Sequence, residues 1–576
     1  MIGALLLDLA AWCALPAAFL TLYVRNFLEP VDAVVPHLRL VLALFVAFAL
    51  LRLLLWRFVH ETAGRLGAAL AGSALLAVLL AYYVLVLVGL QFWGRVVSWD
   101  LIRTYGDQVP DLADALGVSL ALVVAVGAAI YLVLFATVWL YLRYTDWTRA
   151  VALRLAKRHF IALALMATGV CALELYLFTT SPATQQGEPI SLTFYPLETD
   201  LHGHAVDERH AAALDSLENQ ARAAYAPGAQ RERHNLVLII VDGLRPDHMG
   251  IYGYPRDTTP NLARLDRSGR LRKAPAVHAV CSSSVCGILG LASSRYVHQF
   301  SEHPITLHEV LRRNGYRVHA LLSGDHTLYY GLKQVYGQVD SYYDAADARR
   351  EHGIQYMNDD AIVLDRLAEL PDWDGTPTML HFHLMSAHIV ARRTVTKWTP
   401  ALHYGVFNRD SSRPYPADTA INYYDNGVLQ ADQTISALLA ILERKGYLRD
   451  TLVALTADHG EAIGEHGIVG HTRTVHEESL RVPLVLISYG YRPAARIDRR
   501  RFASQIDIAP TLLTELGIPR PSTWRGTPLQ EPATPEFSYF QERWEIGLFD
   551  LREPGKLWKY WVDNRTGAQY AFDPLR

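Results

Sequence analysis

The sequence has few cysteines and almost no net charge. It holds four cysteines in 576 residues, which excludes a small scaffold built on disulfides. Lys and Arg number 54 against 57 Asp and Glu, which gives a formal net charge of −3. A general nucleic-acid binder needs a basic surface to displace counterions from phosphates, so we expect no nucleic-acid partner. We also find no internal repeat and no low-complexity segment.

Charged residues are scarce as well, at 19% against 51% hydrophobic residues, and the mean hydropathy of +0.10 is high for a soluble protein. The apolar excess lies in five runs, each near or above the roughly 20 residues that cross a bilayer as a helix. The runs cover about residues 3–23, 40–58, 66–92, 116–142 and 159–179. We therefore predict a five-helix transmembrane bundle over residues 1–180.

The charges between these runs predict their orientation. Residues 57–65 and 143–158 are rich in Arg, whereas residues 93–114 carry four Asp against two Arg. Because basic loops face the cytoplasm, the N-terminus should be cytoplasmic and everything after residue 180 extracytoplasmic. The first run lacks a basic start and contains Asp8, so we expect it to remain as a span and not to be cleaved as a signal peptide.

From residue 181 the composition becomes that of a soluble domain. Residues 181–234 are expected to form a juxtamembrane linker with a surface helix over 207–225, and residues 235–576 a second domain. In that domain, strand-like runs at 236–241, 317–322, 378–384, 452–456 and 484–487 alternate with helical patterns at 260–268, 306–314, 420–444 and 507–516. This alternation predicts an α/β domain with a mainly parallel central sheet.

Polar residues follow three of these strands. Asp242 comes directly after the first, His388 follows the strand at 378–384, and Asp458 with His459 follows the strand at 452–456, in a glycine-rich stretch that also holds His471. Ligands bind at the carboxyl ends of parallel strands. Carboxylates and imidazoles are ligands that zinc and manganese accept, so we predict a metal site there. A turn cap is the alternative for Asp242, and a structural role the alternative for His388.

A serine-rich turn, Cys281–Ser284, leads into an apolar helical pattern from Val285 to Ala292. Hydroxyl groups at a helix N-terminus gain from free backbone N–H groups and the helix dipole, which favour an alkoxide and an incoming anion. The alternative is a helix cap without chemistry. The ligand candidates elsewhere favour a metal-activated serine nucleophile.

Several stretches resemble the sulfatase/alkaline-phosphatase superfamily, in family order over about residues 235–520. They are Val241–Gly253 with Thr259–Leu262, Cys281–Tyr296, Thr306–Tyr316, Asp458–Glu461 with Gly464–Gly467, and Glu477–Pro483. Five spans ahead of such a domain resemble the bacterial phosphoethanolamine and phosphoglycerol transferases of the lipoteichoic-acid-synthase-like group.

The resemblance implies roles for nine positions, one of which, Ser284, has two. The metal ligands are Asp242, Ser284, Asp458 and His459; the catalytic residues are Ser284, His388 and His471; the substrate-binding residues are Asp325, His326 and His466. His388 and His471 match histidines that hold a second metal or the substrate phosphate. The metal is expected to be zinc or manganese, with calcium or magnesium as alternatives.

The nucleophile has three candidate positions. Counting back from Arg295-Tyr296, which resembles the family's Gly-Arg-Tyr, selects Ser284, whereas the local Val-Cys-Ser pattern selects Cys281, and Ser282 is a further alternative. The turn lacks the Pro and Arg of the sulfatase motif in which a Cys becomes formylglycine. We expect Ser284. Whether Cys281 and Cys286 form a disulfide is left open by their spacing.

The resemblance implies a metal-dependent transferase of the bacterial inner membrane with a periplasmic or extracellular catalytic domain. It would move phosphoethanolamine or phosphoglycerol from a lipid donor to an envelope glycan or lipid through a phosphoserine. The alternatives are a hydrolase of sulfuric or phosphoric esters, and a non-enzymatic lipid-binding regulator of the envelope.

Overall fold

The computed structural model forms two compact units, Met1–Glu198 and Thr199–Arg576. It describes the chain outside residues 1, 28–32, 94–95, 100–101, 104–105, 107–118, 145, 181–186, 195–207, 229–233, 276, 328, 353–357, 402–416, 473, 494–495, 498–501, 533–534, 543, 554–555, 565 and 575–576. Of the segment expected as a linker, α9 (Pro189–Phe194) belongs to the first unit and α10 (Glu208–Ala224) to the second. The rest of that segment lies largely outside the described residues.

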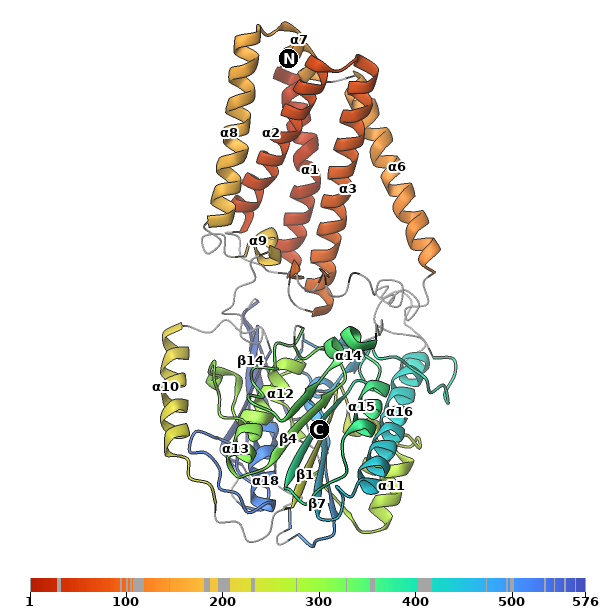
Figure 1. Cartoon of the computed structure of the whole chain (residues 1–576), viewed down its shortest axis with the longest axis vertical. Coiled ribbons are helices and arrows are strands. Elements are labelled where there is room, and N and C mark those ends of the chain that lie inside the picture. Colours follow the sequence, from red (N-terminus) through yellow and green to blue (C-terminus); the bar gives the residue numbers. More distant parts are fainter. Residues whose placement is uncertain are drawn as a thin grey trace. The chain divides into compact units, whose positions relative to one another are not determined.

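The first unit consists of long apolar helices (Figure 1). They are α1 (Ile2–Phe27), α2 (Val34–Phe58), α3 (Glu61–Trp93), α6 (Leu120–Tyr144) and α8 (Lys157–Thr180), with the short α7 (Trp147–Arg154) between the last two. Five helices are long and apolar enough to cross a membrane, which confirms the predicted five-helix bundle.

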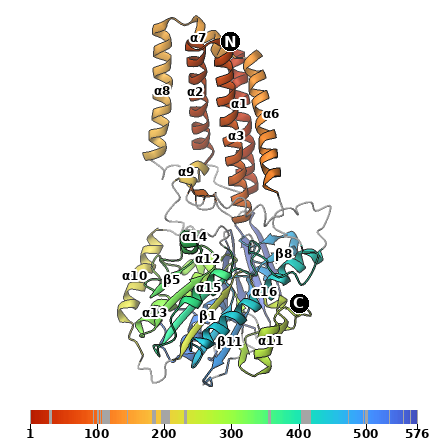
Figure 2. The same cartoon turned by 45° about the vertical axis from the view of Figure 1, so that its right-hand side comes forward.

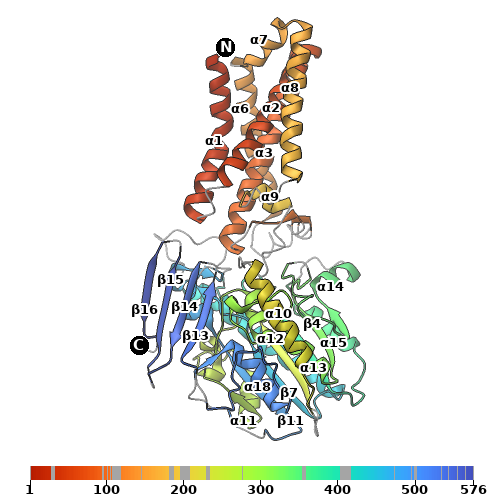
Figure 3. The ribbon, with the colours of Figure 1, turned by 90° about the vertical axis from the view of Figure 1, so that its left-hand side faces the viewer.

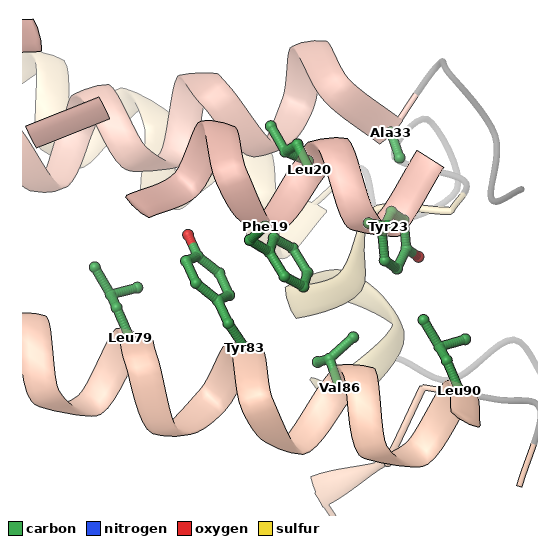
Figure 4. Close-up of a cluster of buried hydrophobic side chains, with 8 residues drawn as sticks. All are labelled: Phe19, Leu20, Tyr23, Ala33, Leu79, Tyr83, Val86 and Leu90. Atoms are coloured by element: carbon green, nitrogen blue, oxygen red, sulfur yellow. The ribbon is translucent and has the colours of Figure 1, made fainter. Parts of the chain in front are cut away.

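Helices α1 and α3 pack through a cluster of buried apolar side chains (Figure 4). The rings of Phe19 and Tyr83 stack in parallel at its centre, with centroids 4.0 Å apart. Two pairs of opposite charges lie within the spans: the buried Arg52 donates to Asp8 at 2.5 Å. Glu174 of α8 likewise accepts from Arg39 at 2.8 Å. Pairing lowers the cost of placing these charges among apolar helices.

The second unit is built on a seven-stranded sheet of order β2-β11-β7-β1-β6-β4-β5. The strands are β1 (Asn235–Val241), β2 (Leu271–Lys273), β4 (Arg317–Leu322), β5 (Ser341–Tyr343), β6 (Thr378–Leu384), β7 (Thr451–Thr456) and β11 (Leu484–Tyr489). The pairs β1–β6, β1–β7, β4–β6 and β4–β5 are parallel, whereas β11 runs antiparallel to β7 and β2. The mainly parallel α/β domain is confirmed.

Helices cover both faces of this sheet (Figure 1, Figure 2). One face carries α11 (Pro260–Arg267), α15 (Ala361–Glu369) and α16 (Ala417–Arg444); the other carries α12 (Ser284–Ser293), α13 (Leu307–Arg313) and α18 (Ile508–Glu515). Burial on both faces explains why β1, β6 and β7 are buried along their whole length, as their nearly unbroken apolar sequences predict.

A second, four-stranded antiparallel sheet ends the chain (Figure 3). Its strands, in spatial as well as chain order, are β13 (Phe537–Glu542), β14 (Glu545–Asp550), β15 (Trp558–Asp563) and β16 (Ala568–Phe572). The sequence patterns did not predict these strands. Two small sheets, β10-β3-β12 and β8-β9, complete the unit; their strands are β3 (Val277–His278), β8 (Ala462–Ile463), β9 (Val469–Gly470), β10 (Arg481–Val482) and β12 (Ala503–Ser504).

Candidate active site

Three neighbouring strands deliver polar residues to one edge of the central sheet. Strand β1 lies between β6 and β7 and is parallel to both, so the carboxyl ends of all three meet. Asp242 follows β1, Asp458 and His459 follow β7, and His388 follows β6. One potential ligand atom from each of Asp242, Asp458 and His459 lies within 4.8 Å of the other two, and all three residues are buried.

Helix α12 brings Ser284 into this cluster. Ser284 is its first residue, and its Oγ lies 3.2 Å from Asp242 Oδ2 and 3.1 Å from His459 Nε2. The close approach depends on Gly287, because a Cβ at that position would lie 2.2 Å from the carbonyl oxygen of Asp458. The small residue in the first turn of α12 therefore sets how near the helix start comes to the loop after β7.

The other two nucleophile candidates point elsewhere. Ser282 donates from its backbone N–H and its hydroxyl to Glu542, at 2.9 and 3.2 Å. Cys281 forms a disulfide with Cys286, with Cα atoms 6.3 Å apart, so its sulfur is neither a free thiol nor available for conversion to formylglycine. Of the three candidates, Ser284 is the one whose side chain contacts Asp242 and His459.

The buried groups around Ser284 suit a divalent cation. Among the described residues, Asp242 Oδ1, Asp458 Oδ2 and His383 Nε2 are buried without a hydrogen-bond partner. Burial, followed by repulsion from Asp458, raises the pKa of Asp242 to about 6. The pKa of Asp458 lies below its usual value, because His459 and His383 outweigh the effect of burial. Two buried carboxylates that share one space in this way need a positive charge between them.

The hydrogen bond made by the His459 ring also suits a divalent cation at this place. Its Nδ1 lies 2.7 Å from the carbonyl oxygen of Gly460, which can only accept a hydrogen bond. Nδ1 therefore carries a proton, and Nε2 is the ring nitrogen that faces Asp242, Asp458 and Ser284. An imidazole nitrogen in this position can bind a metal.

His388 and His471 lie beside this cluster, with ring centroids 5.0 Å apart; the centroid of His471 is 4.2 Å from that of His459. Burial lowers the pKa of His471, but the Glu461 carboxylate, 3.1 Å from its Nδ1, more than offsets this and raises the pKa to about 9. For His388 the shift is in the other direction: burial and the neighbouring His471 hold its pKa well below the usual value. Of this pair, His471 is therefore an imidazolium at neutral pH and His388 a neutral imidazole. His388, Glu461 and His471 also form a second group that could hold a cation.

The three residues assigned to substrate binding occupy different places. His326 is buried, its Nδ1 lies 2.8 Å from the hydroxyl of Tyr336, and its ring faces His383 with centroids 4.6 Å apart. Asp325 accepts from the backbone N–H of Thr327 at 3.0 Å.

His466 lies in a separate group. Its Nδ1 is 2.8 Å from Glu478, and its ring stacks on His476. These three residues form a further potential cation-binding group, distinct from the one around Ser284.

The structure adds two residues that the sequence patterns did not identify. His383 on β6 has its Nε2 3.8 Å from Asp242 and 3.9 Å from Asp458. Tyr330, between β4 and β5, donates to Asp242 Oδ2 at 3.1 Å. His383 had a usable signal, since it shares the strand that leads to His388; Tyr330 had none, because it lies in a loop.

The comparisons with known proteins agree with this architecture. The family model described as "Sulfatase" matches residues 234–518. N-acetylgalactosamine-6-sulfatase of Canis lupus familiaris is 23% identical over 330 residues, which is 50% of this chain and 63% of that protein. Kdo(2)-lipid A phosphoethanolamine 7''-transferase of Salmonella typhimurium is 26% identical over 288 residues, 47% of each chain. The chain spans between 20% and 63% of the first curated relatives it matches.

The chain is also similar to the solved structure of the integral membrane protein lipooligosaccharide phosphoethanolamine transferase A of Neisseria meningitidis. The TM-score is 0.48, the sequence identity is 20%, and the match covers 79% of this chain and 85% of that one. The family match rests on the second unit, whose sheet, serine turn and strand-end ligands are those described above. Residues 234–518 of this chain are a sulfatase-family domain of the alkaline phosphatase superfamily.

Proposed function

We propose that this chain is a metal-dependent, membrane-anchored transferase. It moves a phospho-head group, phosphoethanolamine or phosphoglycerol, from a lipid donor to a glycan or lipid of the bacterial envelope. The observation that carries the proposal is the position of Ser284, whose hydroxyl lies at a helix start within 3.2 Å of Asp242 and 3.1 Å of His459. The five membrane-spanning helices favour a lipid as the donor.

In the first step, Ser284 Oγ attacks the phosphorus of the donor. A bond from Oγ to phosphorus forms, and the bond from phosphorus to the diacylglycerol oxygen breaks. Asp242 Oδ2, 3.2 Å from Oγ, is placed to accept the serine proton. The N-terminus of α12 stabilises the negative charge that develops on Oγ and on the phosphate.

Asp242, Asp458, His459 and Ser284 would hold the metal, and their mixed oxygen and nitrogen donors favour zinc or manganese. When bound, such a cation lowers the pKa of a coordinated hydroxyl group and neutralises charge on the phosphate.

His471 and His388 supply the acid and base. The imidazolium of His471 binds the phosphate oxygens and gives its proton to the departing diacylglycerol oxygen. The neutral His388 then accepts the proton of the acceptor hydroxyl, which attacks phosphorus and releases Ser284. Asp325, His326 and His466 are proposed to contact the substrate anion, His466 from its separate group with His476 and Glu478.

A hydrolase is the second candidate, because the matched relatives include sulfatases. In that case water replaces the acceptor in the second step. The bridged Cys281 disfavours formylglycine chemistry, so a hydrolase would also use Ser284. A regulator without turnover is disfavoured by the complete set of nucleophile, carboxylates and histidines.

Intact-mass measurement tests the proposal. The purified, metal-loaded chain is incubated with bacterial phospholipids, and an adduct of about 123 Da identifies phosphoethanolamine or one of about 154 Da phosphoglycerol on the nucleophile. Peptide mapping should place the adduct on Ser284. Release of free phosphoethanolamine or glycerol phosphate into water, without transfer to an added acceptor, would favour the hydrolase.

A further inference from the structure

The exposed apolar side chains of the second unit are concentrated on one sheet. Among the described residues of this unit, six large hydrophobic side chains are strongly exposed, and five of these belong to the sheet β13–β16. They are Tyr539 (38% exposed), Ile546 (42%), Trp558 (36%), Tyr560 (40%) and Tyr570 (45%); the sixth is Leu217. An apolar surface gathered in this way marks an interaction site more often than scattered exposure does.

The strand register places four of the five on the same face. Tyr539 pairs with Leu548, and Leu548 with Tyr560; Ile546 and Trp558 lie two residues away from this row, so their side chains point the same way. The partly exposed Phe537, Leu548 and Val562 lie on the same face, as does Gln541, which pairs with Ile546. Among the described residues of β13–β15, Asp550 is the one acidic group on this face, and it pairs with Arg552 at 2.7 Å.

The opposite face of the sheet packs on its own unit and reaches the active-site turn. Phe540, Phe549 and Trp561 are buried there. Gln541 donates its backbone N–H to the carbonyl oxygen of Val280 at 2.9 Å, and Glu542 accepts from Ser282. The sheet is therefore fixed to the segment that carries Ser284, and whatever covers its outer face also orients the active site.

The composition of the outer face indicates the occupant. Aliphatic side chains accompany Trp and Tyr, the two residue types that concentrate where a bilayer meets water. A glycan platform would need hydrogen-bonding groups between the rings, and the row Tyr539, Leu548, Tyr560 has an aliphatic side chain there instead. The chain also carries five helices able to span a membrane, so a bilayer is always within reach of this unit.

We propose that the outer face of β13–β15 docks on the lipid bilayer, with Tyr539, Ile546, Trp558 and Tyr560 inserted into its interfacial region. Such insertion removes apolar area from water at the boundary between head groups and acyl chains. It holds the second unit in one orientation with the Ser282–Ser284 turn one sheet layer away from the lipid.

Depth-dependent fluorescence quenching tests this proposal on the full chain. Cys13 and Cys171 are replaced by alanine, a single cysteine is introduced by Tyr560→Cys, and an environment-sensitive dye is attached. The protein is placed in phosphatidylcholine nanodiscs with or without lipids that carry a spin label near the head group. The matched control carries the same dye at Thr514→Cys, on α18, where the native side chain is exposed.

We expect spin-labelled lipid to quench the dye at position 560 at least about three-fold more than the dye at position 514. Adding Ile546→Asp, which places a charge on the same face, should reduce that difference to near zero. Equal and weak quenching at both positions would overturn the proposal. So would a dye at 560 that is shielded from aqueous iodide but not quenched by lipid, because a second protein would then cover the face.

Discussion

Ser282 and Ser284 lie in one turn but contact different residues. Replacing Ser284 should therefore affect turnover, and replacing Ser282 should mainly affect stability. Ser284→Ala removes the hydroxyl beside Asp242 and His459, so we expect the covalent adduct to disappear and turnover to fall by at least about 10³-fold, with little change in Tm. Ser282→Ala loses a hydrogen bond to Glu542 worth about 1 kcal/mol and should keep measurable turnover. A fully active Ser284→Ala with an inactive Ser282→Ala would show that the nucleophile is Ser282.

The carboxylates of Asp242 and Asp458 near Ser284 predict that the protein binds a metal. We expect roughly one or two divalent ions per chain by elemental analysis, and Asp458→Asn or His459→Ala should abolish both metal and activity. The fold should survive, because metal-free Asp458→Asn relieves the repulsion between two buried carboxylates. Wild-type protein without stoichiometric metal, and without a response to added metal, would contradict the catalytic role.

The raised pKa of His471 predicts how activity depends on pH. As pH rises through about 9, His471 loses its proton, and kcat/KM should fall because the imidazolium that binds phosphate is lost. Glu461→Gln removes the charge that raises this pKa, so the alkaline limb of the profile should move to lower pH. An unchanged alkaline limb in Glu461→Gln would assign it to another group.

The same shift affects stability. Because the pKa of His471 in the folded protein, about 9, lies above its ordinary value of 6.5, the His471–Glu461 pair stabilises the fold fully below pH 6.5. This stabilisation is lost as pH rises through about 9. Unfolding of wild type and Glu461→Gln, measured across this range, should therefore converge at high pH.

Residues after strands were the part of the site that sequence could predict. Asp242, Asp458 and His459 each follow an apolar run, and parallel strands bring such positions together. Tyr330 could not be found in this way, because it lies in a loop whose path depends on the packing around it. His383 could have been found, because it lies on β6, the strand that leads to His388.

The position of helix α12 depends on Gly287, which has no side chain. Gly287→Ala would place a Cβ 2.2 Å from the carbonyl oxygen of Asp458, so either the helix or the loop after β7 must move. We expect a loss of about 1–3 kcal/mol of stability and a larger relative loss of activity, because Ser284 moves with the helix. Gly127→Ala in α6 is the matched helical control, since nothing lies within 4 Å of its Cβ position. Equal, small effects of the two changes would show that α12 is not held at its closest approach.

Strands that are buried along their whole length could be predicted from the sequence. The runs of β1, β6 and β7 are apolar because helices cover both faces of the sheet. The strands β13–β16 were not predicted from the sequence, because charged residues lie on the face of this sheet that packs against the rest of the unit. Lys559 is buried there and pairs with Glu477 at 2.8 Å, which breaks the alternation of apolar and polar residues that marks a strand.

At the scale of the whole molecule, the basic residues at 57–65 and 143–158 predict that the second unit is extracytoplasmic. An alkaline-phosphatase fusion after residue 576 should be active, and a green fluorescent protein fusion at the same place dark. The reverse pattern would overturn the orientation, and with it the proposed access to envelope acceptors.

The order of the central sheet has a consequence for how the protein is made. Strand β7 lies beside β1, yet it is synthesised more than 200 residues later, and it carries Asp458 and His459 at its end. A ribosome completes the five spans and Ser284 long before these groups exist. A nascent or prematurely terminated chain that ends between α12 and β7 therefore carries Ser284 without Asp458 and His459, and the cluster is complete only once 459 of the 576 residues have been made.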